Sequence, residues 1–86
     1  MRRYNIQIKE SAAKSLKQLP PNQQLRIRQK IASLAGNPYP PETRKLKGEE
    51  SAYRMRIGDY RVVSEVLEEI ITVLVLRIGN RKDVYR

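Results

Sequence analysis

Three arginines stand in the stretch "YRMRIGDYRVV", residues 53 to 63. Arg54 and Arg56 precede Gly58-Asp59 and Arg61 follows it, and this dipeptide is typical of a two-residue β-hairpin turn. Such a turn fixes the strand register, so Arg56 should face Arg61 and all three arginines should share one side of the sheet. Guanidinium groups bind phosphate oxygens in pairs, which makes this side a candidate phosphate-binding surface.

The opposition of Arg56 and Arg61 needs an explanation. Like charges directly opposed across two strands cost about 0.2–1 kcal/mol, so a hairpin with a purely structural role gains nothing from this pair. One explanation is a polyanionic ligand. The other is an internal acid that neutralises the cluster, either Glu65 on the same face or Asp83 in the C-terminal segment.

Composition favours the polyanion and limits the chemistry. The 86 residues include 18 Lys and Arg against 9 Asp and Glu, with a net charge of +9, which suits nucleic acid or an acidic protein. There is no His and no Cys, so histidine-based nucleases, Ser-His-Asp triads and thiolate zinc sites are excluded. We therefore expect no metal or cofactor, and any catalysis must use Arg, Lys and Tyr, with or without one Asp or Glu.

Length and apolar patterning bear on the compartment. A chain of 86 residues suits a single domain, residues 1–86. The lack of cysteine favours the cytosol. The longest apolar run, Ile70 to Leu76, is far shorter than a membrane span, so we expect a cytoplasmic protein with no membrane partner.

The first half of the chain predicts one strand and two helices. Residues 3–9 alternate in the manner of a half-buried strand. A helix capped by Ser11 should run to Leu19 and stop at Pro20. A second helix should begin at Pro21 and end before Gly36 in a left-handed stop, and residues 37–41 should form an extended connector.

The second half predicts three strands, at residues 52–57, 60–67 and 70–78, joined as an antiparallel meander. Strand one should pair into this meander. The fold class is therefore α+β, a four-stranded antiparallel sheet with the helix hairpin packed on one face. The face predicted to meet the helices carries Tyr53, Met55, Ile57, Tyr60, Val62 and Val66, and the opposite face carries the arginines.

The C-terminal segment "RIGNRKDVYR", residues 77–86, is also basic. If it folds toward the arginine face, Arg81 and Tyr85 join the cluster. If it frays, as termini usually do, it is only a basic tail.

Several motifs together resemble the RelE/ParE superfamily of bacterial type II toxins over essentially the whole chain. They are "NPYPP", "KLKG" at residues 45–48, "YRMRIGDYRVV" and the closing "GNRKDVYR". RelE-type members are ribosome-dependent endoribonucleases that cut messenger RNA in the ribosomal A site. ParE-type members share the fold but inhibit DNA gyrase and lack the nuclease residues.

The resemblance assigns roles residue by residue. It implies an RNA-cutting site made of Arg54, Arg56, Arg61, Arg81 and Tyr85. Five further basic residues are expected to contact the RNA: Lys45, Lys47, Arg77, Lys82 and Arg86. It implies no metal. The implied partners are an acidic RelB-like antitoxin and the ribosome with its message, with operator DNA bound only indirectly through the antitoxin.

The chain departs from the family pattern in ways that leave the general base open. Well-studied RelE members carry lysines at the positions of Arg54 and Arg56, and arginine cannot give up its proton as lysine can. Ser64 stands where tyrosine is common, and Asn80 where histidine often precedes the arginine. Alternatives are a ParE-like gyrase inhibitor without chemistry and an inactive toxin that represses transcription with its antitoxin. Arg81 and Tyr85 at the family spacing favour the nuclease.

Overall fold

The computed structural model describes residues 3–46, 48 and 51–80. Its two helices lie between the first two strands, and a short 3-10 turn lies between the last two. In chain order the elements are β1 (Asn5–Ile8), α1 (Glu10–Lys17), α2 (Pro21–Ser33), β2 (Thr43–Lys45), β3 (Ala52–Ile57), β4 (Tyr60–Leu67), the 3-10 turn η1 (Glu68–Ile70) and β5 (Thr72–Asn80).

The strands form one sheet in the order β1-β5-β4-β3-β2. The α+β class is confirmed, but the expected four-stranded, purely antiparallel sheet is wrong in two respects. A fifth strand, β2, pairs with the edge of β3, and β1 runs parallel to β5. Parallel pairing needs a long connection, and the helices and the hairpin between β1 and β5 provide one.

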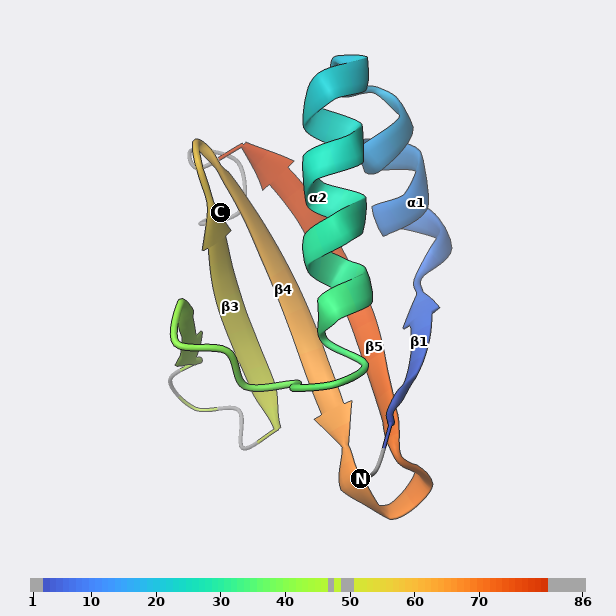
Figure 1. The fold of residues 1–86 in the computed structure, drawn as a ribbon, viewed down its shortest axis with the longest axis vertical. Helices are drawn as coiled ribbons and strands as arrows, with labels where there is room; N and C mark the ends of the chain where they lie inside the picture. The colour runs from blue at the N-terminus through green and yellow to red at the C-terminus, as the bar shows by residue number, and fades with distance from the viewer. Residues whose placement is uncertain (1–2, 47, 49–50, 81–86) are drawn as a thin grey trace.

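Both helices pack on one face of the sheet, as the sequence predicts. In Figure 1, α2 lies across β4 and β5, with α1 beside it on the side of β1. No helix in the described part of the chain is long and apolar enough to span a membrane. The core between helices and sheet consists of Ala12, Leu16, Ile27, Ile31 and Leu34 from the helical half and Met55, Ile57, Val62, Val66, Val73, Val75 and Ile78 from the strands.

The helix ends differ from the predicted ones. Lys9, rather than Ser11, occupies the N-cap of α1, and no side chain caps that end. Gly36 is not in the left-handed region, since among the described glycines only Gly48 and Gly58 have positive φ. Instead α2 tightens at its end, because Leu34, Ala35 and Gly36 each donate to the carbonyl three residues earlier.

The β3–β4 hairpin agrees with the prediction in its bounds and its register. Ile57 pairs with Tyr60 and Arg56 with Arg61. Gly58 takes a φ of 59°, a conformation that a side chain would strain. The turn chemistry of Gly58-Asp59 therefore determines which residues share a face.

The link between β4 and β5 contains a strained residue. The strand expected at residues 70–78 begins two residues later, because Glu68–Ile70 form the 3-10 turn and Ile71 follows with a φ of 48°. A β-branched residue in the left-handed region costs about 1–2 kcal/mol, since its Cβ crowds the following carbonyl.

Replacing Ile71 with Gly should therefore raise the free energy of unfolding by about 1 kcal/mol. Urea denaturation of the two proteins would measure the difference. The matched control is Ile70→Gly, because Ile70 is 63% exposed and has an ordinary backbone conformation. If both variants lose stability equally, side-chain contacts of Ile71 outweigh its backbone strain.

Candidate functional site

Four arginines from three strands line one pocket on the face of the sheet opposite the helices. Strand register places Arg44 beside Arg54 and Arg56 beside Arg61. The pocket has a volume of about 300 Å³, and its lining is completed by Pro41 and Glu42. We call this hollow, lined by Pro41, Glu42, Arg44, Arg54, Arg56 and Arg61, the arginine pocket.

The four guanidinium groups differ in exposure. Arg44 and Arg56 are exposed and Arg54 is half-buried, whereas Arg61 is only 6% exposed. Arg61 therefore lies deepest among the four. A charge shielded from water in this way attracts an anion more strongly than an exposed charge does, because the local dielectric is lower.

Sequence reasoning missed two members of the pocket, Arg44 and Glu42. Both follow the proline-rich connector, where β2 is only three residues long and its neighbours give no alternating pattern. Thr43 is the one weak strand signal in that segment. The place of Arg44 beside Arg54 becomes visible only when β2 pairs with β3, and Glu42, which precedes β2, lines the same pocket.

The acid beside the arginines is Glu42 and not Glu65. Ser51 donates to Glu65 at 3.0 Å, and Glu65 lies four residues along β4 from Arg61, which separates the two by roughly 13 Å. Asp83 lies outside the described residues. Glu42 itself is paired with Lys30 on α2, with 2.8 Å between Nζ and Oε2. The hydrogen bond from Lys30 holds the pKa of Glu42 below its usual value, so this carboxylate is ionised at neutral pH.

The other residues predicted to contact RNA do not all lie on the arginine side of the sheet. Arg77 pairs with Val63 across β4 and β5, which places it on the arginine side of the sheet. Lys45 pairs with Tyr53, whose ring packs against the core, so Lys45 belongs to the opposite side of β2. The remaining predicted site residues, which are Lys47, Arg81, Lys82, Tyr85 and Arg86, fall outside the described residues.

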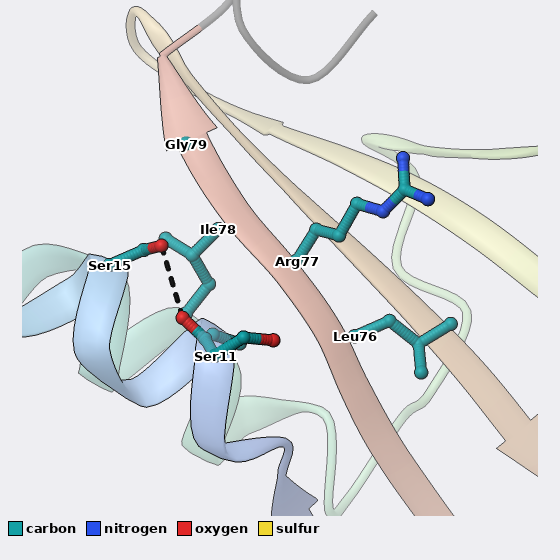
Figure 2. A pocket seen from close by; sticks show the side chains of 7 residues that line it. Ser11, Ser15, Leu76, Arg77, Ile78 and Gly79 are labelled. Carbon is teal, nitrogen blue, oxygen red and sulfur yellow. Dashed lines mark hydrogen bonds between the residues drawn. The ribbon is translucent and has the colours of Figure 1, made fainter. Parts of the chain in front are cut away.

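A second hollow, of about 290 Å³, lies between α1 and β5. Ser11 and Ser15 line it from the helix, where the Ser15 hydroxyl donates to the Ser11 carbonyl at 3.1 Å. Figure 2 shows Arg77 pointing to the side of β5 away from these serines, whereas Ile78 points toward them. Arg77 belongs by its pairing with Val63 to the arginine side of the sheet, and it also lines part of this hollow.

A tyrosine cluster occupies the end of the molecule near the 3-10 turn. The hydroxyls of Tyr4 and Tyr39 both donate to the Glu68 carboxylate, the second at 2.7 Å. The Tyr39 ring meets Tyr53 edge to face, with 5.1 Å between centroids. Partial burial and the hydrogen bond to Glu68 raise the pKa of Tyr39, which keeps its hydroxyl protonated. These contacts therefore join the start of β1, the connector, β3 and the 3-10 turn.

The pocket can bind a phosphodiester and stabilise added negative charge on it. Its arginines offer only hydrogen-bond donors, and Glu42 is an ionised acceptor at the edge of the same space. Within the described residues, no group of three or more His, Cys, Asp or Glu is placed to hold a metal ion.

Comparison with known proteins identifies the family. The model described as "ParE toxin of type II toxin-antitoxin system, parDE" matches residues 6–85. A Methanocaldococcus jannaschii protein, provisionally assigned as toxin RelE1, is 33% identical over 87 aligned positions, which cover 98% of this chain and 97% of the relative.

Solved structures agree with this result. In the archaeal RelE-RelB complex from Pyrococcus horikoshii, the matching chain superimposes with a TM-score of 0.79 at 27% identity, covering 93% of this chain and 97% of that one. The isolated RelE toxin of Escherichia coli gives a TM-score of 0.80 at 26% identity, with coverage of 95% and 90%. The chain therefore belongs to the RelE/ParE superfamily of toxins from type II toxin-antitoxin systems.

Proposed function

We propose that this chain is the toxin of a RelBE-type pair and that it acts as a ribosome-dependent endoribonuclease on messenger RNA. The observation that carries the proposal is the arginine pocket. Four guanidinium groups from β2, β3 and β4 surround one hollow of about 300 Å³, at the lower end of the size range of small-molecule sites. A scaffold role would not require Arg56 and Arg61 to face each other there.

In the proposed reaction the ribose 2′-hydroxyl attacks the adjacent phosphate. The products are a 2′,3′-cyclic phosphate and a 5′-hydroxyl. Arg54, Arg56 and Arg61 stabilise the charge that grows on the phosphate oxygens, which is usually the largest catalytic contribution, and Arg44 adds a fourth donor group. The guanidinium groups supply this stabilisation without a metal ion.

The C-terminal residues complete the proposed site. Arg81 assists the departing 5′-oxygen, and Tyr85 positions the nucleobase or accepts the 2′ proton. Further contacts to the RNA backbone are proposed for Lys47, Arg77, Lys82 and Arg86, whereas Lys45 lies on the side of β2 opposite the arginine pocket. The roles of Arg81 and Tyr85 follow from the family resemblance, and the remaining contacts follow from the positive charge of the other residues.

The proposed partners are an acidic RelB-like antitoxin and the ribosome with its message. The net charge of +9 favours both, since each presents negative charge. The similar Pyrococcus horikoshii structure is a RelE-RelB complex, which supports the antitoxin. Operator DNA would be reached only through the antitoxin, and the proposed compartment is the cytoplasm.

A ParE-like activity is the second candidate, because the matching family model is named for ParE toxins. Such a protein would inhibit DNA gyrase by binding, without chemistry on the arginines. A third candidate is an inactive toxin that serves with its antitoxin in a repressor complex bound to DNA.

Two assays on one preparation separate these candidates. We expect the purified chain to cut a message at the A site of translating ribosomes, mapped by primer extension, and to leave gyrase supercoiling unchanged. Inhibited supercoiling with an intact message would favour the ParE-like function. Inactivity in both assays, together with operator binding in complex with the antitoxin, would favour the repressor.

A further inference from the structure

Glu42 is a carboxylate in a pocket otherwise suited to anions. It lines the arginine pocket together with Arg44, Arg54, Arg56 and Arg61. A fixed negative charge there repels the phosphate that the arginines would bind. Its presence therefore weakens ground-state binding, and a role in the reaction would explain it.

The proposed reaction needs a group that accepts a proton. Arginine side chains carry donors and no acceptor, and they do not ionise in the useful range. The side chain of Pro41 has no polar atom. Of the described residues that line the pocket, only Glu42 therefore offers a side-chain oxygen to the 2′-hydroxyl of a bound nucleotide.

The carboxylate is held in place and has remaining acceptor capacity. Lys30 Nζ lies 2.8 Å from Oε2, and the Glu42 side chain is 35% exposed. A carboxylate has about four lone-pair positions, so the bond to Lys30 leaves room for another donor. Because Lys30 also lowers the pKa of Glu42, the carboxylate is ready to accept at neutral pH.

We propose that Glu42 accepts the proton of the attacking 2′-hydroxyl, an inference that rests on the proposed nuclease function. The 2′-oxygen forms its bond to phosphorus as its proton moves to the Glu42 carboxylate. The bond from phosphorus to the 5′-oxygen breaks, and that oxygen takes a proton from water. Glu42 then releases its proton to solvent, Lys30 acts as the positioning residue, and Tyr85 is left to position the nucleobase.

The first test is Glu42→Gln, assayed by single-turnover cutting on programmed ribosomes. Loss of a general base should lower the cutting rate about 100-fold. Removal of the negative charge should at the same time tighten binding to ribosomes whose message carries an uncleavable 2′-deoxynucleotide in the A site. A slower reaction with tighter binding is the expected combination.

The second test is Lys30→Gln, which keeps the carboxylate and removes its partner. Among the described residues, the charged groups that bridge to Glu42 or line the same pocket are Lys30 from α2, Arg44 from β2, Arg54 and Arg56 from β3, and Arg61 from β4. Without Lys30 the pKa of Glu42 rises toward its usual value. The acid limb of the pH-rate profile should then move to higher pH, while most of the cutting at neutral pH is retained.

Lys14→Gln is the matched control. It breaks an exposed ion pair with Glu10, at 3.9 Å on α1, and should change neither the rate nor the pH profile. Equal effects of Glu42→Gln and Lys30→Gln, without a shift of the acid limb, would show that the pair is only structural and would overturn the inference.

Unchanged cutting by Glu42→Gln beside an active unmodified chain would also overturn the inference and leave the nuclease function standing. A larger rate loss in Tyr85→Phe in that case would assign the proton to Tyr85. If the unmodified chain does not cut, both proposals are wrong.

Discussion

Replacing Arg61 with Gln should slow single-turnover cutting of messenger RNA on ribosomes by about 100-fold or more, the scale observed when one oxyanion donor is removed. Arg61 lines the arginine pocket, is 6% exposed and stands opposite Arg56. In the proposed reaction its guanidinium group would meet the phosphate with little screening by water, so the added charge of the transition state should depend on it strongly. Glutamine keeps a donor but loses the charge.

Arg56→Gln is the matched variant, because Arg56 lies on the same face but is exposed. Exposed ion pairs are worth about 1 kcal/mol at most, so this variant should lose less than tenfold in cutting. Its free energy of unfolding should stay level or rise by about 0.2–1 kcal/mol, since it removes the opposition to Arg61. A larger loss for Arg56 than for Arg61 would contradict the view that depth in the pocket determines the effect.

Stability has to be measured for the Arg61 variant too, because a side chain that is 6% exposed also packs within the sheet. A thermal melt of each free toxin gives the folded fraction at the assay temperature. If Arg61→Gln is largely unfolded there, the cutting rate of Arg61→Lys is measured instead, since this variant keeps the charge and loses the paired guanidinium donors. Full cutting by a folded Arg61→Lys protein would show that paired donation to phosphate is not required.

The hairpin could be predicted from sequence because its information is local. Gly58-Asp59 sets the turn, the turn sets the register, and the register determines that Arg56 meets Arg61. The two helices could also be located, because Pro20 separates them and apolar residues recur on one side of each. These elements already place the arginines away from the core.

The rest depends on contacts between distant segments. The direction of β1 is decided by its pairing with β5, about seventy residues away, and nothing in its own sequence indicates a parallel neighbour. The pairing of β4 with β5 shifts by one residue between Val63, which faces Arg77, and Ser64, which faces Val75. Such a bulge leaves no clear signal in the sequence. Arg44 and Glu42 were missed for the same reason, because residues 43–45 form a strand only by pairing with β3.

A chain that ends at Asn80 should fold and should not cut RNA. The described core extends from Ala12 to Ile78, and β5 ends at Asn80, so deleting residues 81–86 leaves these elements in place. The deletion removes Arg81 and Tyr85, to which the family resemblance assigns the leaving group and the nucleobase. We therefore expect cutting to fall below detection, while the circular dichroism spectrum stays close to that of the full chain.

The point variants Arg81→Gln and Tyr85→Phe in the full chain are the controls, because they keep the length of the C-terminal segment and change only the proposed chemistry. If the truncated chain unfolds while both point variants cut normally, the segment is structural and its catalytic assignment is wrong. If the truncated chain folds and still cuts, the arginine pocket is sufficient without the segment. Gyrase inhibition that survives the truncation, in the absence of any cutting by the full chain, would instead place the protein with the ParE-like toxins, whose activity needs neither residue.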